Sequence, residues 1–416
     1  MGATDRLRLS ARWLLPVGSP PIEHGVLEIE AGRIRAVHAA GPADIDFGNA
    51  AILPGLVNCH THLDLTGMSG MNPPRADACE WLRQVILFRG SVTPNDVTQS
   101  ISQGLDQCLR HGTTLVGDVS GDGRSWSLLN GSPIRAVVFR EMLGLPKDRA
   151  ERSWQQAQVW LGQCSTTERC RPGLSPHAPY STRTSLIRAA GAVGVPVAIH
   201  LAEFREEREL LEEQQGPFVS FLQELGVWDP LGLARSPEHV IRLFSAETPT
   251  LLVHGNYLAA TAPIPQKATV VYCPRTHEAF GHTPHPVANM FRRGVRVVLG
   301  TDSLASNPDL SILAEMRFLH AVRPDVPCNT ILQMGTIFGA EALGWAADVG
   351  TLEAGKAADF IVVALPNENG DPLELLLESY EEVKETWIAG QCVFRLDADH
   401  KDSATAQQHS HEPESF

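Results

Sequence analysis

The chain has 416 residues, of which 43% are hydrophobic and 20% charged, and these values are ordinary for a soluble globular protein. Its length suits one large domain or two domains of unequal size. The formal net charge of −14 argues against a broad surface for nucleic acid or for an acidic membrane, so we expect a small-molecule partner.

The sequence also favours a cytoplasmic location. No run approaches the ~18 apolar residues of a membrane helix, and the N-terminus lacks the pattern of a secretory signal. Eight cysteines are scattered along the chain without a CxxC pair. In a chain of this length they are typical of reduced thiols.

Both ends of the chain are rich in β-forming residues and enclose a long middle. Residues 24–40 predict two short strands joined by a turn at residues 31–32. Residues 350–365 and 385–394 again alternate or cluster β-formers.

The middle alternates apolar β-type runs with segments of helical length. The runs are the one ending at His60, then 113–118, 134–141, 173–180, 195–203, 250–256, 268–274 and 295–303. The intervening segments include 150–164, 182–193, 204–224 and 308–322. Strands that alternate with helices form a parallel sheet, and eight such units predict an α/β fold of the closed (β/α)₈ barrel type.

Side chains that can bind a metal fall at the ends of these predicted strands. They are His60 and His62 after the first run, His177 after the fourth, His200 and Glu203 at the fifth, His254 at the sixth and Asp302 at the eighth. Active sites of such barrels lie at this end of the strands. Residues i and i+2 of a strand face the same way, so His60 and His62 can reach one ion. Together with His200 and Asp302 they would suit Zn²⁺ or Fe²⁺.

Each of these residues alone has an ordinary structural explanation. A lone His-x-His is a weak signal: His409 and His411 repeat the spacing within residues 397–416, which are polar and predict a disordered tail. A single buried histidine is more often hydrogen-bonded in the core. The joint pattern favours a metal site, because burying four such groups without partners would be costly.

Seven segments form a pattern that is specific when they are taken together. They are PGLVNCHTH (54–62), SPHAPYS (175–181), HLAEFREE (200–207), VHGNYL (253–258), CPRTHEAFGH (273–282), GTDSLASN (300–307) and GTLEAGKAADFIVV (350–363). With them the chain resembles the amidohydrolase superfamily, in the branch of cytosine, guanine and adenosine-type deaminases and triazine hydrolases. The resemblance implies a distorted barrel at residues 52–345 and a small β-sandwich built from residues 1–51 and 346–396.

The same resemblance implies a role for each residue at the strand ends. The residues that match the ligands of one divalent metal ion, Zn²⁺ or Fe²⁺, are His60, His62, His200 and Asp302. Glu203 matches the general acid/base, His254 the histidine that orients the attacking group, and His177 a substrate-facing histidine. Members with two metals carry a carboxylated lysine on the fourth strand, and residues 170–180 contain no lysine.

The implied reaction is the hydrolytic deamination of an amino-substituted nitrogen heterocycle. A divalent metal lowers the pKa of bound water towards ~7. Asp302 would orient that water, and Glu203 would carry its proton to the ring nitrogen and then to the leaving amine. The alternative for Glu203 is a helix-cap acid, which its spacing from His200 disfavours.

The segment after the first metal pair bears on the substrate. Residues 78–90, with Trp81, resemble the WLxxVI stretch of nucleoside-type members. In the deaminases of methylthioadenosine and S-adenosylhomocysteine, a glutamate just beyond it contacts ribose. Here Gly90 falls at that position with Arg89 beside it, which disfavours those two substrates. The stretch resembles more closely the aminodeoxyfutalosine deaminases of menaquinone synthesis, whose substrate is a 6-aminopurine nucleoside with a 5′ benzoate.

Three arginines and two residues after the seventh strand are further candidates for substrate contacts. Arg89, Arg140 or Arg275 could meet the benzoate carboxylate, and ordinary surface arginine is the alternative for each. Phe280 could stack on a base or pack under its loop. His277 stands where related deaminases often have asparagine.

Two other functions stay open from the sequence alone. One is a triazine-type hydrolase that displaces chloride or a substituted amine, against which Glu203 weakly argues, because a leaving amine needs a proton. The other is a non-catalytic scaffold, although such relatives usually lose the metal ligands that this chain keeps. The sequence also leaves a homo-oligomer open.

Overall fold

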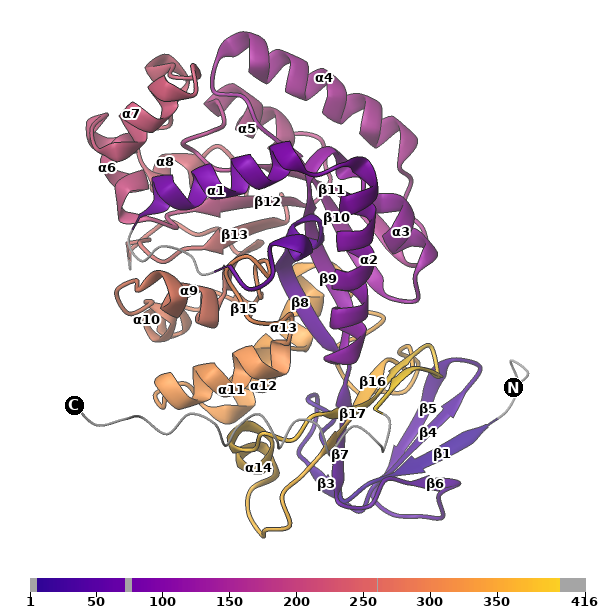
Figure 1. Cartoon of the computed structure of the whole chain (residues 1–416). Coiled ribbons are helices and arrows are strands. Elements are labelled where there is room, and N and C mark those ends of the chain that lie inside the picture. Colours follow the sequence, from indigo (N-terminus) through magenta and orange to yellow (C-terminus); the bar gives the residue numbers. More distant parts are fainter. Residues whose placement is uncertain (1–5, 72–76, 260, 397–416) are drawn as a thin grey trace, which may run out of the picture.

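The computed structural model describes residues 6–71, 77–259 and 261–396. Eight parallel strands form one sheet in chain order from β8 to β15 (Figure 1). Just after β15, the amides of Thr301 and Asp302 donate to the carbonyl oxygen of His60 at 3.1 and 3.0 Å, which joins the last strand to the first. The predicted (β/α)₈ barrel is therefore confirmed. Its strands are β8 (Leu56–Thr61), β9 (Thr113–Ser120), β10 (Arg135–Met142), β11 (Cys170–Pro176), β12 (Val197–Leu201), β13 (Thr250–His254), β14 (Ala268–Tyr272) and β15 (Val297–Leu299).

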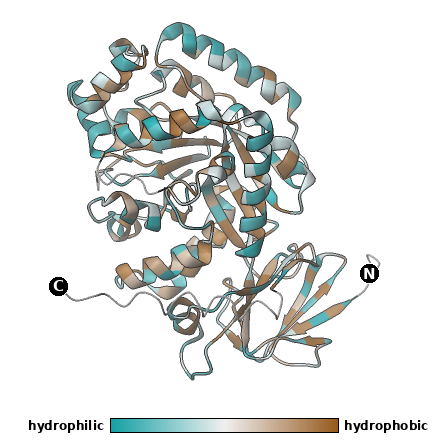
Figure 2. Ribbon diagram, in the orientation of Figure 1, coloured by the Kyte–Doolittle hydropathy of each residue, from teal (hydrophilic) through white to brown (hydrophobic). Residues whose placement is uncertain are grey.

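Helices surround the barrel, and Figure 2 shows mostly hydrophobic strands behind helices whose outer faces are largely hydrophilic. The segment of helical length at residues 204–224 contains two helices. Gln214 and Gly216 take left-handed backbone conformations with φ of 54° and 85°, and Pro217 then begins the second helix. The helices are η1 (Leu63–Met68), α1 (Ala78–Ser91), α2 (Pro94–Arg110), η2 (Gly121–Gly123), α3 (Trp126–Gly131), α4 (Lys147–Gln163), α5 (Thr184–Gly191), α6 (Arg205–Glu213), α7 (Pro217–Glu224), η3 (Pro230–Gly232), α8 (Pro237–Ile241), α9 (Pro274–Phe280), α10 (Val287–Arg292), α11 (Ile312–Val322), α12 (Cys328–Met334), α13 (Ile337–Ala342) and α14 (Pro372–Glu378).

A β-sandwich combines strands from both ends of the chain, seen as adjoining indigo and yellow strands in Figure 1. One sheet has the order β5-β4-β1-β6 and the other β18-β17-β16-β7-β2-β3. Leu27 of the first sheet and Phe360 of the second belong to one buried cluster, so the sheets pack face to face. The strands are β1 (Leu7–Ser10), β2 (Trp13–Leu14), β3 (Ile22–Glu23), β4 (Val26–Glu30), β5 (Arg33–His38), β6 (Ile45–Asp46), β7 (Ala50–Pro54), β16 (Phe360–Ala364), β17 (Val383–Ile388) and β18 (Gln391–Arg395).

The sandwich and the barrel are connected where β7 leads into β8. Only Gly55 separates these strands, and a side chain there would overlap Thr114 of β9. The amide of Gly55 donates to the carbonyl oxygen of Asp359 at 3.0 Å. The carboxylate of Asp359 pairs with Arg135 at the start of β10, at 2.9 Å. The first metal-site strand is thus fixed directly against the sandwich.

Two expectations concern the chain as a whole. Among the described helices, none combines the length and apolar character needed to cross a membrane. The predicted disordered tail, residues 397–416, lies outside the described residues.

Candidate active site

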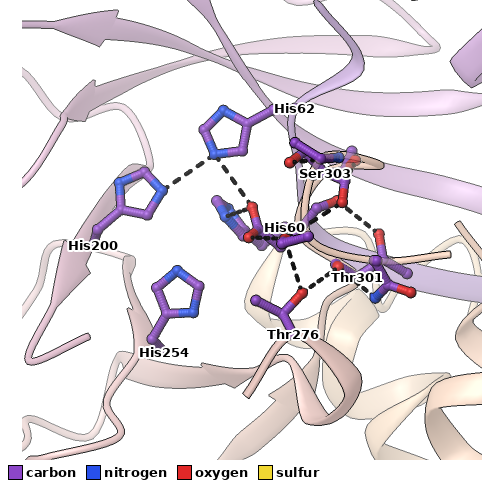
Figure 3. Close-up of polar contacts among 12 residues, drawn as sticks. His60, His62, His200, His254, Thr276, Thr301 and Ser303 are labelled. Carbon is purple, nitrogen blue, oxygen red and sulfur yellow. Dashed lines mark hydrogen bonds and ion pairs between the residues drawn. The ribbon is translucent and has the colours of Figure 1, made fainter. Parts of the chain in front are cut away.

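Three histidines converge at the C-terminal end of the barrel strands. His60 is the next-to-last residue of β8, His62 comes two residues after it, and His200 lies in β12. Each offers a ring nitrogen, and these nitrogens all lie within 4.8 Å of one another. The Nε2 atoms of His62 and His200 are 3.2 Å apart, and Figure 3 shows the rings turned towards one space.

The surroundings of these rings fit a bound cation. The Nδ1 of His200 lies 2.8 Å from the carbonyl oxygen of His177 and donates to it, which leaves the Nε2 lone pair facing the site. Both ring nitrogens of His60 and the Nδ1 of His62 are buried without a hydrogen-bond partner among the described residues. Burial lowers the pKa of His62 to about 3, so that ring is neutral and can act as a ligand. These three histidines form a metal site.

Asp302 lies beside the three histidines, after β15. Its Oδ1 is 3.4 Å from the Nε2 of His60 and 3.7 Å from the Nε2 of His62. The hydroxyl of Ser306 donates to the other carboxylate oxygen at 2.8 Å. Burial alone would raise the pKa of Asp302, but the neighbouring imidazoles, His60 foremost, outweigh it and keep the pKa below its usual range. An ionised carboxylate oxygen therefore faces the imidazoles.

Glu203 and His254 face each other across the same space. The Oε1 of Glu203 is 3.5 Å from the Nε2 of His254, and both side chains are at least nine-tenths buried. Burial and then the charge of Asp302 raise the pKa of Glu203 well above its ordinary range. Burial lowers the pKa of His254 well below its own. The pair supplies a carboxyl group and a neutral imidazole next to the metal site.

A buried carboxylate that the sequence analysis missed holds Glu203 in place. Glu207, in α6, is 0% exposed. Its two oxygens accept the backbone N–H groups of Ala202 and Glu203 at 2.8 and 3.2 Å. The signal in the sequence was an acid on the inward side of a helix otherwise rich in exposed charges.

Three cavities adjoin the site, and two residues, Arg89 and Glu141, line all of them. The metal pocket has a volume of about 60 Å³ and is lined by His62, Trp81, His177, Glu203, His254 and Asp302 among others. The apolar cavity, of about 340 Å³, is lined mainly by Leu82, Val85, Ile86, Leu145, Phe221 and Val227, together with Arg149. The arginine cavity, of about 620 Å³, includes Arg124, Arg140, Arg149 and Arg152.

The predicted substrate residues divide into those that line a cavity and those that do not. Trp81 and His177 line the metal pocket, and the Nδ1 of His177 is 2.7 Å from the Ser181 hydroxyl. Arg89 donates to Glu141 at 2.6 Å. Arg140 is 5% exposed and lines the arginine cavity. Burial lowers the pKa of Arg140, whose one hydrogen bond within the described part of the chain goes to the backbone carbonyl of Glu141.

His277, Phe280 and Arg275 lie outside the three cavities. Phe280 is 1% exposed and packs edge-on against Trp81, with ring centroids 5.6 Å apart. It therefore packs against that ring in the core. The Nδ1 of His277 is 3.0 Å from the side-chain oxygen of Asn256. The guanidinium of Arg275 is paired with Asp309 and Glu315 at 2.6 and 2.7 Å and is therefore not free to meet a substrate.

Known proteins resemble this chain over most of its length. A sequence profile of the amidohydrolase family matches residues 51–393. The chain is 31% identical over 381 residues to a 5-methylthioadenosine/S-adenosylhomocysteine deaminase of Moorella thermoacetica, covering 84% of this chain and 83% of that protein. A protein of the same name from Nitratidesulfovibrio vulgaris is 28% identical over 405 residues, covering 90% and 88%.

Solved structures share the fold at lower identity. The aminofutalosine deaminase of Helicobacter pylori, in complex with methylthio-coformycin, matches with a TM-score of 0.82 and 23% identity, covering 93% of this chain and 100% of that one. An adenosine deaminase from Xanthomonas campestris with bound zinc matches with a TM-score of 0.75 and 23% identity, covering 93% and 92%. From the family match and the three-histidine metal site, we conclude that the chain belongs to the amidohydrolase family and is a metal-dependent deaminase, a hydrolase of carbon–nitrogen bonds.

Proposed function

We propose that the protein hydrolytically deaminates a 6-aminopurine nucleoside, with aminodeoxyfutalosine as the preferred substrate. The observation that carries this proposal is that the metal pocket, the apolar cavity and the arginine cavity adjoin one another in that order. The metal pocket shares Leu82, Val85 and Tyr180 with the apolar cavity, and Arg149 lines both the apolar and the arginine cavity. A substrate whose amino carbon lies at the metal pocket can therefore extend an apolar group that ends in an anion.

The proposed metal is one Zn²⁺ ion, with Fe²⁺ as the alternative. Its proposed ligands are His60, His62, His200 and Asp302, whose nitrogen and oxygen atoms suit either ion. Zinc is the first choice because the Xanthomonas campestris adenosine deaminase, which shares the fold, contains it. When bound, such an ion supplies an activated water at neutral pH.

The proton transfers fall to the protein's own residues. Glu203 would accept one proton of the attacking water and deliver it to the ring nitrogen, and would then carry the proton of the added hydroxyl to the departing amine. His254, 3.5 Å from Glu203, would orient the attacking oxygen. The products are the 6-oxopurine nucleoside and ammonia.

The 5′ group of the substrate is proposed to lie in the outer cavities. The apolar cavity offers Leu145, Phe221 and Val227 to an aromatic or thioether group. Arg140, which forms no ion pair within the described part of the chain and donates to the carbonyl oxygen of Glu141, would bind a terminal carboxylate. A benzoate joins both features in a single group.

A second candidate is supported by the relatives. The proteins of Moorella thermoacetica and Nitratidesulfovibrio vulgaris are named as deaminases of 5-methylthioadenosine and S-adenosylhomocysteine. S-adenosylhomocysteine also carries a carboxylate on its 5′ group and would suit Arg140, whereas methylthioadenosine would leave the arginine cavity unused.

The test is ammonia release from a panel of amino heterocycles by protein loaded with Zn²⁺ or Fe²⁺. The panel contains adenosine, methylthioadenosine, S-adenosylhomocysteine, aminodeoxyfutalosine, free adenine and an aminotriazine. We expect kcat/KM to be highest for aminodeoxyfutalosine. Preference for S-adenosylhomocysteine would select the second candidate, and turnover of the triazine alone would contradict both. Fully metal-loaded protein that releases ammonia from no purine would overturn the proposed function.

A further inference from the structure

Glu141 is a buried carboxylate with one oxygen unused. It lies near the end of β10, and the residue is 7% exposed. Arg89 donates to its Oε2 at 2.6 Å. Its Oε1 is buried and has no hydrogen-bond partner among the described residues. A buried acceptor without a partner is unfavourable, so a ligand that donates a hydrogen bond to this oxygen would gain binding free energy.

The other side of the carboxylate is rigidly held. Arg89 also lies 3.5 Å from Asp64, which itself accepts the amide of Gly121 at 3.3 Å. Burial alone would raise the pKa of Glu141, but the charge of Arg89 outweighs it and lowers the pKa to about 2. Glu141 is thus ionised, oriented and paired with a cation. Its free oxygen can only accept a hydrogen bond, because an ionised carboxylate carries no proton to donate.

The position of Glu141 identifies the part of the substrate that would meet it. Together with Arg89 it borders the metal pocket, the apolar cavity and the arginine cavity. The Nε2 of His177, which lines the first two, is 4.0 Å from the free Oε1. A nucleoside whose base reaches the metal and whose 5′ group fills the outer cavities must place its sugar at this junction.

We propose that Glu141 determines specificity for a ribosyl group, with its free Oε1 accepting a hydrogen bond from a sugar hydroxyl. This inference rests on the proposed function, because it needs a nucleoside in the site. The unprotonated acceptor beside Arg89 fits a neutral hydroxyl donor better than an ammonium group. Arg89 acts through Glu141 as a positioning residue.

The experiment combines changes in the enzyme with changes in the substrate. Wild type and Glu141→Gln are assayed with adenosine, 2′-deoxyadenosine and 3′-deoxyadenosine. For adenosine, Glu141→Gln should lower kcat/KM by roughly 10- to 100-fold, the loss expected when a charged hydrogen-bond acceptor is removed. For the deoxynucleoside that lacks the bound hydroxyl, the same variant should differ from wild type by less than about threefold.

Controls separate this role from a structural one. Glu247→Gln, an exposed glutamate paired with Lys267 at 2.6 Å, should behave as wild type with all three nucleosides. Glu141→Asp keeps a charge for Arg89 but withdraws the carboxylate, so it should show the same hydroxyl-dependent loss and serves if Glu141→Gln fails to fold. Metal content and thermal midpoint are measured for every variant.

The outcomes are distinct. Equal losses for adenosine and both deoxynucleosides would overturn the role of Glu141 while leaving the deaminase proposal intact. If wild type deaminates none of the panel's 6-aminopurine nucleosides, the proposed function fails and this inference fails with it. A loss confined to one hydroxyl supports the assignment and identifies that hydroxyl.

Discussion

At the scale of single residues, the site depends on backbone conformations that are unusual for the residues concerned. Ala202, His254 and Asp302 have φ of 52°, 68° and 59°, in the left-handed region that glycine favours. Each lies where a barrel strand ends. Hydrogen bonds hold all three: Ala202 N–H to Glu207, His285 to the carbonyl oxygen of His254, and Asp302 N–H to His60. Such strain costs of order 1–3 kcal/mol per residue and persists only where neighbours enforce it.

Replacing Glu203 tests the proton-transfer role directly. Glu203→Gln keeps the shape of the side chain but cannot take up and return a proton, so kcat should fall by about 10²–10⁴-fold. Metal content, measured by elemental analysis, should stay at the wild-type value. A variant with near-normal kcat and full metal would exclude Glu203 as the general acid/base.

Replacing Glu207 tests whether the turn beneath Glu203 matters for the reaction. In Glu207→Gln one amide oxygen remains to accept, so one of the two N–H groups of Ala202 and Glu203 loses its partner. We expect kcat to fall by about 10–100-fold with little change in KM, as for other residues that orient a reacting group. Glu213→Gln, exposed on the same helix, is the matched control. Equal kcat values for the two variants would contradict a positioning role.

The sequence reveals some of these residues and conceals others for a physical reason. His60 and His62 could be predicted because two-residue periodicity and a strand end are local properties. The significance of Glu141 depends on Arg89, which lies 52 residues earlier on another element. Whether Phe280 stacks on a substrate or under Trp81 is likewise decided by packing between distant segments. Contacts between residues on distant segments could therefore not be predicted from the sequence alone.

At the scale of elements, hydrophobic patterning predicted the order and type of the barrel strands well. All eight runs became neighbouring parallel strands, because each strand is buried on both faces and reads as a continuous apolar run. The shortest strands, such as β2 and β6 with two residues each, were not predicted, since two residues carry no periodicity. The break between α6 and α7 follows from local turn chemistry.

Strand β4 of the sandwich carries a carboxylate that should make the stability of the fold depend on pH. Glu28 in β4 is 1% exposed and pairs with Arg6, Arg8 and Arg35 at 2.6, 3.0 and 3.0 Å. Hydrogen bonding by Arg6, followed by the other cations, lowers the pKa of Glu28 from 4.5 to about 2. The stabilisation is therefore complete above about pH 4.5 and is lost as the pH falls towards 2.

The comparison is between Glu28→Gln and wild type in thermal unfolding from pH 7 to pH 3. At pH 7 the variant should melt at a lower temperature than wild type, and this difference in melting temperature should be smaller at pH 3. Glu30→Gln, whose carboxylate on the same strand is 41% exposed, should show little change at either pH. A difference in melting temperature that stays constant with pH would show that the charge of Glu28 does not contribute to stability.

At the scale of the whole molecule, the sandwich braces the end of the barrel opposite the metal site. The buried pair of Arg135 and Asp359 joins the start of β10 to the segment before β16. Asp359 also accepts the amide of Ala389 at 2.8 Å, so a single carboxylate ties three segments together. Because the metal ligands lie at the far ends of the strands, this contact should govern stability more than chemistry.

Asp359→Asn should therefore destabilise the fold by about 3–5 kcal/mol, because it leaves the guanidinium of Arg135 without a counter-charge. Urea unfolding gives the free-energy change, and kcat per folded molecule at 25 °C should stay close to wild type. The double variant Arg135→Met/Asp359→Leu removes both charges and should recover part of the loss. If the double variant is less stable than Asp359→Asn, the buried charge is not the cause.

The pairing of β7 with β16 has a consequence for how the protein is made. Ile52 and Val362 lie opposite each other in the sheet, yet the entire barrel is synthesised between them. At about 5–20 residues per second, β7 would wait on the order of 15 s to one minute for its partner strand. During that interval the apolar edge of β7 is open to pairing with other chains. We expect nascent chains to need chaperone protection there, and expression yield to rise when chaperones are co-expressed.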